Sequence, residues 1–438
     1  MQAQLGKDYP VFAVALDEPP PTSIRYNSRK PYAPTLIAET PVPWHPRGAY
    51  LSERPVFTLD PAFHAGAYYV QEAASMFVAE AYRQLRSRLG DGPVRVLDMC
   101  AAPGGKSTAL LDELADDDLL VANEVIQNRA GILRYNLTKW GRANVAVTNH
   151  DPADFAALAG FFDCILVDAP CSGEGLFRRD PAARAEWSPA AVAHCSARQQ
   201  RILTDTLPLL REGGILLYST CTYNAAENER AVAALLNTGF THLPLAIDPV
   251  WGITPRNMGY QFYPHRTRSE GFYLAALQRT DGGTSFASRH RNLTHLAPLS
   301  RKAAAGLRAQ LPLEKDIYQS KDGQLRYLPA ALQTDWLALD GVLRRKTFGL
   351  RLGELKREQL IPDAALALAV DLPNGSFPTA AVDRETALRY LRGEAVELPD
   401  APLGWVLLQY MGLGLGWAKK LAKRTNNYYP KGWRIRMR

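Results

Sequence analysis

The stretch from Val94 to Leu111, VRVLDMCAAPGGKSTALL, restricts the possible fold of this chain more than any other part of the sequence. Its apolar start predicts a short buried strand, its small residues predict a tight turn, and Lys106 to Leu114 is typical of a helix. A strand, a glycine turn and a helix bring backbone N–H groups close to a nucleotide-like ligand at the edge of an α/β sheet. The stretch therefore predicts a nucleoside-binding turn in an α/β domain.

Spacing argues against two common nucleotide-binding motifs at this turn. Gly105-Lys106-Ser107 fits the end of a phosphate-binding P-loop, but the glycine that must precede it by five residues is replaced by Cys100. The G-x-G-x-x-G fingerprint of dinucleotide-binding folds is also absent. A second predicted strand, Leu119–Glu124, ends in a carboxylate roughly 20 residues beyond the turn, where such folds bind ribose hydroxyls. The pattern indicates a nucleoside site without a triphosphate signature.

Composition sets the class of protein. A chain of 438 residues with 47% hydrophobic and 22% charged residues predicts a globular protein of two or three domains. No apolar run reaches the roughly 18 residues that cross a bilayer, and the start lacks a signal segment, so we expect a cytoplasmic protein without membrane contact. We also expect a monomer. The net charge of +7 favours a polyanionic partner. Reduced thiols and no metal are expected, because the cysteines lack disulfide or zinc spacing. They are Cys100, Cys164, Cys171, Cys195 and Cys221.

Strand and helix patterns alternate from Val94 to Leu277, which predicts a mostly parallel sheet covered on both faces, with ligands at the carboxyl ends of its strands. The predicted strands are Val94–Met99, Leu119–Glu124, Val145–Asn149, Phe162–Asp168, Gly214–Thr220, Thr241–Leu245 and Phe272–Leu277. The predicted helices between them include Gln127–Trp140, Ala190–Arg211 and Ala225–Asn237. At or just after these strand ends lie Asp98, Glu124, Asp151, Asp168 and Cys221.

The flanking regions differ in composition from this part, and the chain divides into four predicted ranges. Residues 1–90 predict a small α+β lobe that ends in a helix, Glu72–Arg88, and residues 91–281 form the central domain. Residues 282–375 predict a linker (Gly282–Arg291) and a small α/β region with strands at Asp316–Tyr318 and Leu325–Leu328. Residues 376–438 predict a C-terminal domain with a helix at Arg384–Arg392 and a strand at Trp405–Tyr410.

The end of the chain is basic and aromatic. From Trp417 onward it has eight Lys and Arg residues and no acid, interleaved with Trp417, Tyr428, Tyr429 and Trp433. Rings that can stack on bases among cations predict contact with RNA.

Two cysteines are candidates for chemistry. The windows FFDCILVDAPCSGEG (161–175) and LLYSTCTYNAAENE (216–229) place Cys171 and Cys221 just beyond core strands. A single cysteine is usually a small buried hydrophobe, but two at strand ends beside a nucleoside site favour a chemical role for at least one. Cys100 lies where the turn needs only a small side chain, and we expect Cys164 and Cys195 to be structural.

A thiol beside a nucleoside-type cofactor suits one reaction in particular. If the cofactor is S-adenosylmethionine, carbon 5 of a pyrimidine is a poor acceptor until a thiolate adds to carbon 6 and makes the ring an enamine. The proton on carbon 5 must then leave and the thiol be eliminated, which calls for a second base. A carboxylic acid near ring nitrogen 3 assists as the adduct forms. Two cysteines and one aspartate fit this scheme.

Three windows carry a resemblance to a known family. CAAPGGK (100–106), DAPCSGEG (168–175) and STCTYNAAENE (219–229) resemble the signature windows of the Sun-family RNA cytosine-5 methyltransferases. Ile24–Asn27 and Tyr69–Glu72 resemble that family's N-terminal lobe, with Ala73 where a proline is expected. Gly414–Arg434 resembles the PUA-like module of the bacterial ribosomal-RNA subgroup, the RsmF type. The resemblance is thin between 282 and 345.

The resemblance implies a class I (Rossmann-like) methyltransferase sheet and S-adenosylmethionine-dependent methylation of cytosine carbon 5 in small-subunit (16S) ribosomal RNA. Cys221 would be the nucleophile on carbon 6, and Cys171 would assist product release. Asp168 would lie between cofactor and cytosine, and Lys106 would line the same site. The resemblance also implies the cofactor residues: Cys100, Ala101, Ala102, Pro103, Gly104, Gly105 and Lys106 around the methionine part, Glu124 on the ribose, Asp151 near the adenine, and Asp168.

Alternatives remain open at this point. The same chemistry on transfer RNA is the nearest, and an RNA-binding ribosome assembly factor with a vestigial cofactor fold is the alternative that is not an enzyme. Intact Cys171, Asp168 and Cys221 disfavour the latter, as Cys100 disfavours a P-loop nucleotidase. For Arg178-Arg179 a phosphate contact and a solvated pair are equally expected. We expect His150 and His265 to be packing or surface residues rather than bases.

Overall fold

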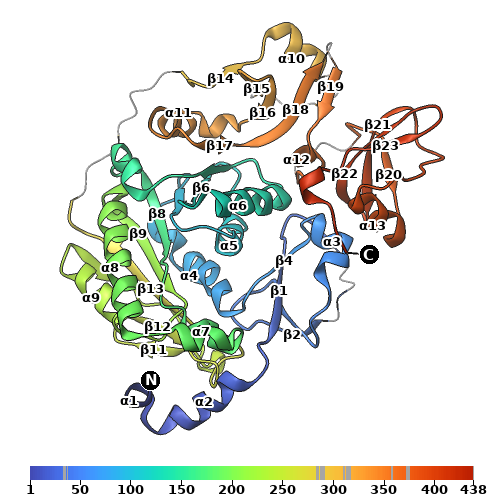
Figure 1. The fold of residues 1–438 in the computed structure, drawn as a ribbon. Helices are drawn as coiled ribbons and strands as arrows, with labels where there is room; N and C mark the ends of the chain where they lie inside the picture. The colour runs from blue at the N-terminus through green and yellow to red at the C-terminus, as the bar shows by residue number, and fades with distance from the viewer. Residues whose placement is uncertain are drawn as a thin grey trace.

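A computed structural model describes the chain from residue 1 to 437, apart from residues 33–35, 37, 283–285, 287–291, 309–310, 312–316, 357–358 and 371–374. Its centre is one large mixed sheet with the spatial order β11-β12-β13-β9-β8-β5-β6-β7-β17 and with β10 paired to β13 (Figure 1). Neighbouring strands from β9 to β7 run parallel, and the outer strands are antiparallel. The predicted α/β class is confirmed.

The parallel strands are β5 (Arg95–Asp98), β6 (Leu119–Asn123), β7 (Val145–Thr148), β8 (Phe162–Asp168) and β9 (Leu210–Thr220). The antiparallel strands are β10 (Phe240–His242), β11 (Thr254–Arg256), β12 (Gly259–Phe262), β13 (Phe272–Arg279) and β17 (Lys346–Phe348).

Each face of the sheet buries its own apolar cluster, because side chains alternate along a strand. Val96 of β5 and Leu120 of β6 point into one cluster, and their neighbours Leu97 and Val121 point into the other. The first cluster is covered by α4 (Phe77–Leu85), α5 (Gly105–Leu111) and α6 (Gln127–Trp140). The second is covered by the 3-10 helix η5 (Pro152–Leu158), α8 (Pro189–Thr206), α9 (Glu229–Leu236) and α11 (Gln333–Val342).

Three of the predicted helices have different ends for identifiable reasons. The helix predicted to end at Arg211 ends at Thr206, because Pro208 cannot continue it. The helix predicted from Glu72 begins at Phe77, since the Glu72 carboxylate accepts from the backbone N–H groups of the turn that precedes it. The helix predicted from Ala225 begins at Glu229, after a turn in which an asparagine side chain accepts a backbone hydrogen bond.

The strand β17 was not predicted. It pairs antiparallel with β7, with Thr347 opposite Val147, and forms the edge of the central sheet although it follows residue 281. The His150 ring fixes this connection, because its Nε2 accepts from the backbone N–H groups of Arg344 (3.2 Å) and Arg345 (2.9 Å). The predicted domain limits stay predictions. Strand β17 lies in the predicted range 282–375 but pairs with β7 of the predicted range 91–281.

Residues 282–375 and the C-terminal domain each form a further sheet. The first has the order β14-β15-β16-β18-β19 and the second β20-β21-β22-β23. Most of the expected linker Gly282–Arg291 lies outside the described residues. Asp316, the first residue of an expected strand, also lies outside them. The elements are β14 (Leu296–Pro298), α10 (Arg301–Arg308), β15 (Ile317–Ser320), β16 (Gln324–Tyr327), β18 (Leu350–Lys356), β19 (Gln359–Pro362), α12 (Ala364–Ala367), β20 (Thr379–Ala381), α13 (Arg384–Arg392), β21 (Gly404–Tyr410), β22 (Leu413–Lys420), β23 (Thr425–Asn427) and the 3-10 helix η10 (Lys431–Trp433).

Two of the four aromatic residues expected to stack on RNA are core residues instead. Trp417 is 1% exposed and donates through Nε1 to the backbone oxygen of Asp363, and Tyr429 is 4% exposed. Strand β22 is buried on both faces from Leu415 to Ala418, and Trp417 belongs to the apolar cluster that includes Leu352 and Leu366. Only Tyr428 and Trp433 of this set have accessible rings.

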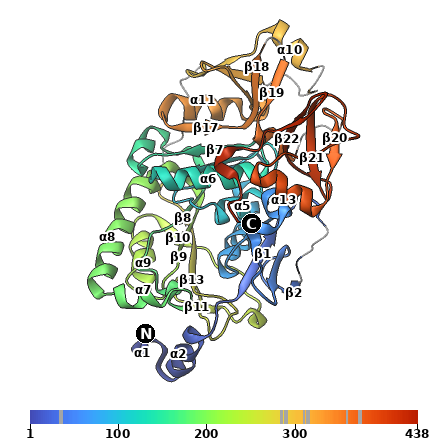
Figure 2. The same cartoon turned by 45° about the vertical axis from the view of Figure 1, so that its right-hand side comes forward.

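The N-terminal lobe packs between the central and the C-terminal domains (Figures 1 and 2). It shares one apolar cluster with the C-terminal domain, which includes Ile24 and Tyr68 on one side and Tyr390 and Leu408 on the other. Its sheet has the order β2-β3-β1-β4. The elements are α1 (Gln2–Leu5), α2 (Tyr9–Asp17), β1 (Thr22–Tyr26), β2 (Ala38–Pro41), β3 (Gly48–Leu51), α3 (Pro61–His64) and β4 (Tyr68–Val70); α7 (Pro181–Glu186) lies in the central part.

One buried arginine joins the N-terminal lobe to the central domain. Arg25 of β1 is fully buried and pairs with Asp112 at 2.6 Å. It also donates to Gln71, to the backbone oxygen of Gly105 and to Thr108 Oγ1, and it lies over the Trp140 ring. A charge removed from water is stable only when paired and fully hydrogen-bonded, as this one is. No helix in the described ranges has the length and apolar character to cross a membrane.

We expect Arg25→Met to lower the free energy of unfolding by about 3–5 kcal/mol, because it leaves the Asp112 carboxylate buried without its cation. Arg29→Met is the matched control, since Arg29 pairs with Asp116 at 2.9 Å but the two side chains are 39% and 68% exposed. That variant should lose no more than about 1 kcal/mol. Urea unfolding measures both, and equal losses would contradict a special role for the buried pair.

Candidate active site

The carboxyl ends of β5, β6, β8 and β9 meet at one edge of the sheet and carry the predicted site residues. Asp98 ends β5 and pairs in register with Leu166 of β8, and Asp168 ends β8 beside Ser219 of β9. Glu124 directly follows β6, and Cys221 directly follows β9. The parallel topology thus gathers these residues on neighbouring strand ends, as the sequence predicts.

An ion pair links the glycine turn to the end of β8. Lys106 Nζ, at the start of α5, lies 2.7 Å from Asp168 Oδ2, and Ser219 Oγ donates to Asp168 Oδ1 at 2.8 Å. Burial alone would lower the pKa of the Lys106 ammonium, but Asp168 and, more weakly, Cys221 raise it above its ordinary value. Lys106 is therefore a fixed cation next to both the aspartate and the Cys221 sulfur.

The two candidate thiols are in direct contact. Cys171 Sγ lies 2.9 Å from Cys221 Sγ and also accepts from the Cys221 backbone N–H at 3.3 Å. The hydrogen bond to Cys221, with burial, raises the pKa of Cys171 well above its ordinary value. Cys171 thus stays a protonated thiol that can donate to the Cys221 sulfur. Both side chains remain partly exposed.

A buried glutamate holds the loop that carries Cys171, and the sequence analysis did not single it out. Glu227 accepts from the backbone N–H and the hydroxyl of Ser172, which follows Cys171, and from Gln199 Nε2 at 2.8 Å. Gln199 also donates to the backbone oxygen of Pro170. The only sequence signal was the position of Glu227 within the same window as Cys221.

Gly175 fixes the approach of the two loops. Its N–H donates to the backbone oxygen of Cys221 at 2.8 Å. A Cβ added there would lie 2.8 Å from that oxygen and from the oxygen of Gly271, closer than Cβ atoms approach. Only glycine lets the Cys171 loop dock against the end of β9.

The turn between β5 and α5 is held from outside by hydrogen bonds to its backbone. Ala101 N–H donates to Asn123 O at 2.8 Å, Arg129 donates to Ala102 O at 2.7 Å, and Asn136 donates to Pro103 O at 2.8 Å. Gly104 has φ of 111°, in the region that favours glycine, just before α5 begins. Cys100 is part of this turn, and burial raises the pKa of its thiol, so it is unsuited to act as a nucleophile.

The carboxylates around the turn have different surroundings. The Glu124 side chain is 4% exposed, pairs with Arg129 at 3.3 Å and accepts from the Ile126 N–H. Asp151 is 37% exposed and held by both guanidinium nitrogens of Arg201 at 3.1 Å.

Asp98 was noted in the sequence only for its position at a strand end. It accepts from Ser107 Oγ at 2.6 Å, whereas its Oδ1 is buried without a hydrogen-bond partner among the described residues. Burial, with repulsion from Asp168, raises its pKa to about 7.

The remaining candidates have structural roles. Arg178 is largely buried, pairs with Glu18 and donates to Ser269 O, whereas Arg179 pairs with Glu270 and keeps 53% of its side chain exposed. A phosphate contact at this pair stays a prediction. His265 packs edge-on against the Phe12 ring. In the part of the chain that the structure describes, no cluster of His, Cys, Asp and Glu could hold a metal ion.

Comparison with known proteins gives consistent matches along the chain. The sequence model of the 16S rRNA methyltransferase RsmB/F family matches residues 90–278. The N-terminal domain of 16S rRNA methyltransferase RsmF matches residues 1–73, and the methyltransferase RsmF PUA domain matches residues 377–435.

Two curated relatives are similar over nearly the whole chain. Ribosomal RNA small subunit methyltransferase F of Escherichia coli O157:H7 is 32% identical over 96% of this chain and 91% of its own length. The protein of the same name from Erwinia tasmaniensis is 32% identical over 91% of this chain and 85% of its own.

Among solved structures, a methyltransferase homologue from Pyrococcus horikoshii is 29% identical with a TM-score of 0.53, covering 63% of this chain and 91% of its own. NSun6 from Pyrococcus horikoshii, solved with SFG, has a TM-score of 0.54 over 64% of this chain and 96% of its own. At 22% identity it shows the shared fold alone.

The surroundings of Asp98 predict a pH dependence of stability. The pKa of Asp98 is about 7 in the folded protein, compared with an ordinary value near 3.8, so the folded state binds this proton more tightly. Its contribution to stability is therefore present below pH 4 and is lost as pH rises to about 7. Asp98→Asn keeps an oxygen for Ser107 but does not titrate. The urea midpoint of this variant minus that of wild type should increase between pH 4 and 7 and stay constant above pH 7. The same difference at every pH would contradict the raised pKa of Asp98.

Proposed function

The chain belongs to the RsmB/F family of 16S rRNA methyltransferases, as its RsmF branch, and we propose that it methylates carbon 5 of a cytosine in small-subunit ribosomal RNA. The methyl donor in this proposal is S-adenosylmethionine, and Cys221 bonds covalently to the base. The observation that carries the proposal is the contact between Cys171 and Cys221 beside the Lys106–Asp168 ion pair. Few other reactions need two touching thiols, a carboxylate and a cation at a nucleoside site.

The residues of the site fit S-adenosylmethionine better than a triphosphate. Asp98, Glu124 and Asp168 contribute three carboxylates against two cations, Lys106 and Arg129, and each of these cations is already paired. Such a balance favours a ligand with a sulfonium, an ammonium and hydroxyl groups over a polyanion. The unpartnered Asp98 Oδ1 offers a buried acceptor at the same strand end.

In this proposal the backbone from Cys100 to Gly105, with Lys106, surrounds the methionine part of the cofactor. Glu124 holds the ribose hydroxyls, because a buried carboxylate after the second strand of such a sheet accepts two hydrogen bonds there. Asp151 lies near the adenine and Asp168 near the transferred group. Both oxygens of the Asp151 carboxylate already accept from Arg201. In this proposal Asp151 therefore contacts the adenine through a remaining lone pair of the carboxylate or through its backbone.

Covalent catalysis begins at Cys221. Its thiolate adds to carbon 6 of the cytosine, which must be flipped out of its stack to reach a strand end. The Lys106 ammonium is the cation near this sulfur, and Cys221 is one of the groups that raise the pKa of Lys106. Asp168, anchored by Ser219 and Lys106, orients the base near ring nitrogen 3 as carbon 5 gains electron density.

S-adenosylmethionine, when bound, supplies the methyl group that carbon 5 accepts. The proton on carbon 5 must then leave before the Cys221–carbon 6 bond breaks. Cys171 is the group nearest the leaving sulfur, at 2.9 Å, and Glu227 holds its loop in place. The hydrogen bond to Cys221 that raises the Cys171 pKa is lost once the Cys221 sulfur is bonded to carbon 6. In this proposal Cys171 then acts as a thiolate and accepts the carbon 5 proton, and Cys221 leaves carbon 6 as a thiolate.

Ribosomal RNA is the preferred substrate because the match extends to the RsmF N-terminal and PUA domains and because two curated relatives carry small-subunit names. Transfer RNA is the alternative substrate for the same chemistry. An assembly factor without activity is disfavoured by the intact geometry of both thiols and of the Lys106–Asp168 pair.

Cofactor binding should depend on Glu124. Glu124→Ala should weaken binding of S-adenosylmethionine by roughly 1–3 kcal/mol, the usual loss when a charged hydrogen-bond partner is removed. Glu124→Gln is the control, since it keeps an oxygen for the Ile126 N–H. Its affinity for S-adenosylmethionine should lie between those of wild type and Glu124→Ala. Calorimetry measures all three, and tight magnesium-dependent binding of ATP would contradict the cofactor assignment.

The two thiols should not be equivalent. Cys221→Ala should form no adduct and no product while still binding cofactor. Cys171→Ala should transfer the methyl group and then stall with RNA attached, giving a band that survives denaturing electrophoresis. Cys195→Ala, on α8, is the matched control and should act as wild type. A stalled adduct from Cys221→Ala would reverse the assignment, and full activity of both variants would remove covalent catalysis.

A further inference from the structure

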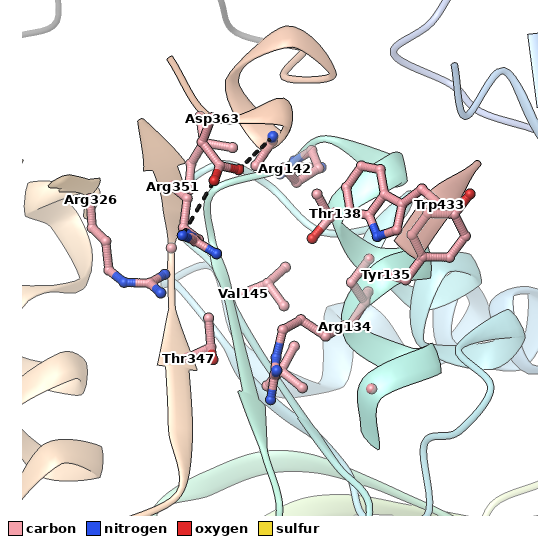
Figure 3. Close-up of a pocket in the computed structure, with 16 residues that line it drawn as sticks. Arg134, Tyr135, Thr138, Arg142, Val145, Arg326, Thr347, Arg351, Asp363 and Trp433 are labelled. Carbon is pink, nitrogen blue, oxygen red and sulfur yellow. Dashed lines mark hydrogen bonds and ion pairs between the residues drawn. The ribbon is translucent and has the colours of Figure 1, made fainter. Parts of the chain in front are cut away.

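A cavity of about 270 Å³ lies away from the candidate active site, where three parts of the chain meet. Its walls come from α6, from β17, β18 and the turn before α12, and from η10 near the C-terminus (Figure 3). Arginine side chains from two of these parts face it: Arg134 on α6, Arg326 on β16 and Arg351 on β18. The proposed reaction uses none of them.

The charges of this cavity are not balanced. Arg134 is exposed and makes no hydrogen bond or ion pair with a described residue, and Arg326 donates to the backbone oxygen of Phe348. Arg351 pairs with Asp363 at 3.3 Å, yet its Nε is buried without a partner among the described residues. Asp363 is the one carboxylate among the described lining residues, and it also caps α12 through the Ala365 N–H. Four lining arginines thus share one acid.

The arginines also repel one another. Burial, followed by the charges of Arg351 and Arg134, lowers the pKa of Arg326 to about 10. A fourth arginine of the wall, Arg142, is different because its donors are satisfied by backbone oxygens of the α5 end and by Asp116. An anion placed between the other three would relieve the repulsion and satisfy the free donors.

The size and the walls indicate which anion fits. The cavity is slightly smaller than the roughly 300–1,000 Å³ of pockets that enclose a whole small molecule, so it suits a phosphate group with part of its sugar. One wall is aromatic: the rings of Tyr135 and Trp433 lie 4.7 Å apart, edge to face. Trp433 belongs to the basic C-terminal segment, between Lys431 and Arg434.

We propose that Arg134, Arg326 and Arg351 bind a backbone phosphate of the RNA substrate at this junction, outside the methylation centre. The proposal rests on the proposed function for its partner and adds a second contact point. Arg129, which holds the turn before α5, and Arg134 both lie on α6, five residues and about 7.5 Å apart along the helix axis. The proposed phosphate contact is thus on the same helix that supports this turn. A phosphate held here fixes the register of the RNA without reading its sequence.

Arg134→Gln tests the proposal, because Arg134 is exposed and unpaired and its loss should leave the fold intact. Binding of a labelled small-subunit ribosomal RNA fragment should weaken roughly tenfold, as expected for one charge-assisted contact. The slope of log K against log salt should fall in magnitude by about 0.7–0.9, the value for one phosphate. Arg134→Lys should restore most of the slope. Affinity for S-adenosylmethionine should not change.

Arg88→Gln is the matched control, since Arg88 is exposed and lies at the amino-terminal end of β5, opposite the active site. It should bind RNA as wild type does. Equal effects of Arg134→Gln and Arg88→Gln would overturn the phosphate site and leave the proposed function standing. Failure of the wild type to bind any ribosomal RNA would overturn both.

A second measurement separates RNA from a free anion. Inorganic phosphate should displace the RNA fragment only weakly and should not change Trp433 fluorescence at submillimolar concentration. A saturable change at that concentration, with unaltered RNA binding in Arg134→Gln, would show a site for free phosphate and contradict the RNA assignment.

Discussion

The ion pair between Lys106 and Asp168 connects the two halves of the candidate site. Lys106 belongs to the glycine turn and the start of α5, and Asp168 ends β8, next to the strand that leads to Cys221. Burial lowers the pKa of the Lys106 ammonium, and this carboxylate and, more weakly, the neighbouring sulfur raise it above its ordinary value. The cofactor side and the thiol side are thus placed relative to each other by one charged contact. A hydrogen bond from Ser219 fixes Asp168, and Glu227 separately holds the loop that carries Cys171.

The distant domains support this contact. Arg25 in the N-terminal lobe donates to Gly105 O and Thr108 Oγ1 and pairs with Asp112, so it holds α5 on both sides of Lys106. The lobe in turn shares an apolar cluster with the C-terminal domain, which includes Tyr68 and Tyr390. The C-terminal domain, which matches the RsmF PUA domain, is therefore packed, through one intermediate lobe, against the helix that carries Lys106. This arrangement explains why the N- and C-terminal regions accompany the catalytic domain in one chain.

Sequence alone predicted the parts of the fold that follow from local periodicity. The central strands, the helix Gln127–Trp140 and the gathering of Asp98, Glu124, Asp168 and Cys221 at strand ends are present as expected, because alternating βα units allow few other arrangements. The edge strand β17, the loop anchor Glu227 and the arginine cavity could not be predicted, since each depends on residues that are far apart in sequence. The burial of Trp417 was missed because an aromatic residue among cations has the same local pattern whether it faces a core or a base.

The central claim is methylation of cytosine carbon 5 in small-subunit ribosomal RNA. Bisulfite sequencing of total RNA from a strain that lacks the gene, complemented with wild type or with Cys221→Ala, tests it most directly. One or a few cytosines of 16S ribosomal RNA should become convertible in the deletion strain and be protected again only by the wild-type gene. Unchanged 16S ribosomal RNA together with newly convertible cytosines in transfer RNA would contradict the substrate. Protection restored by Cys221→Ala would contradict the mechanism.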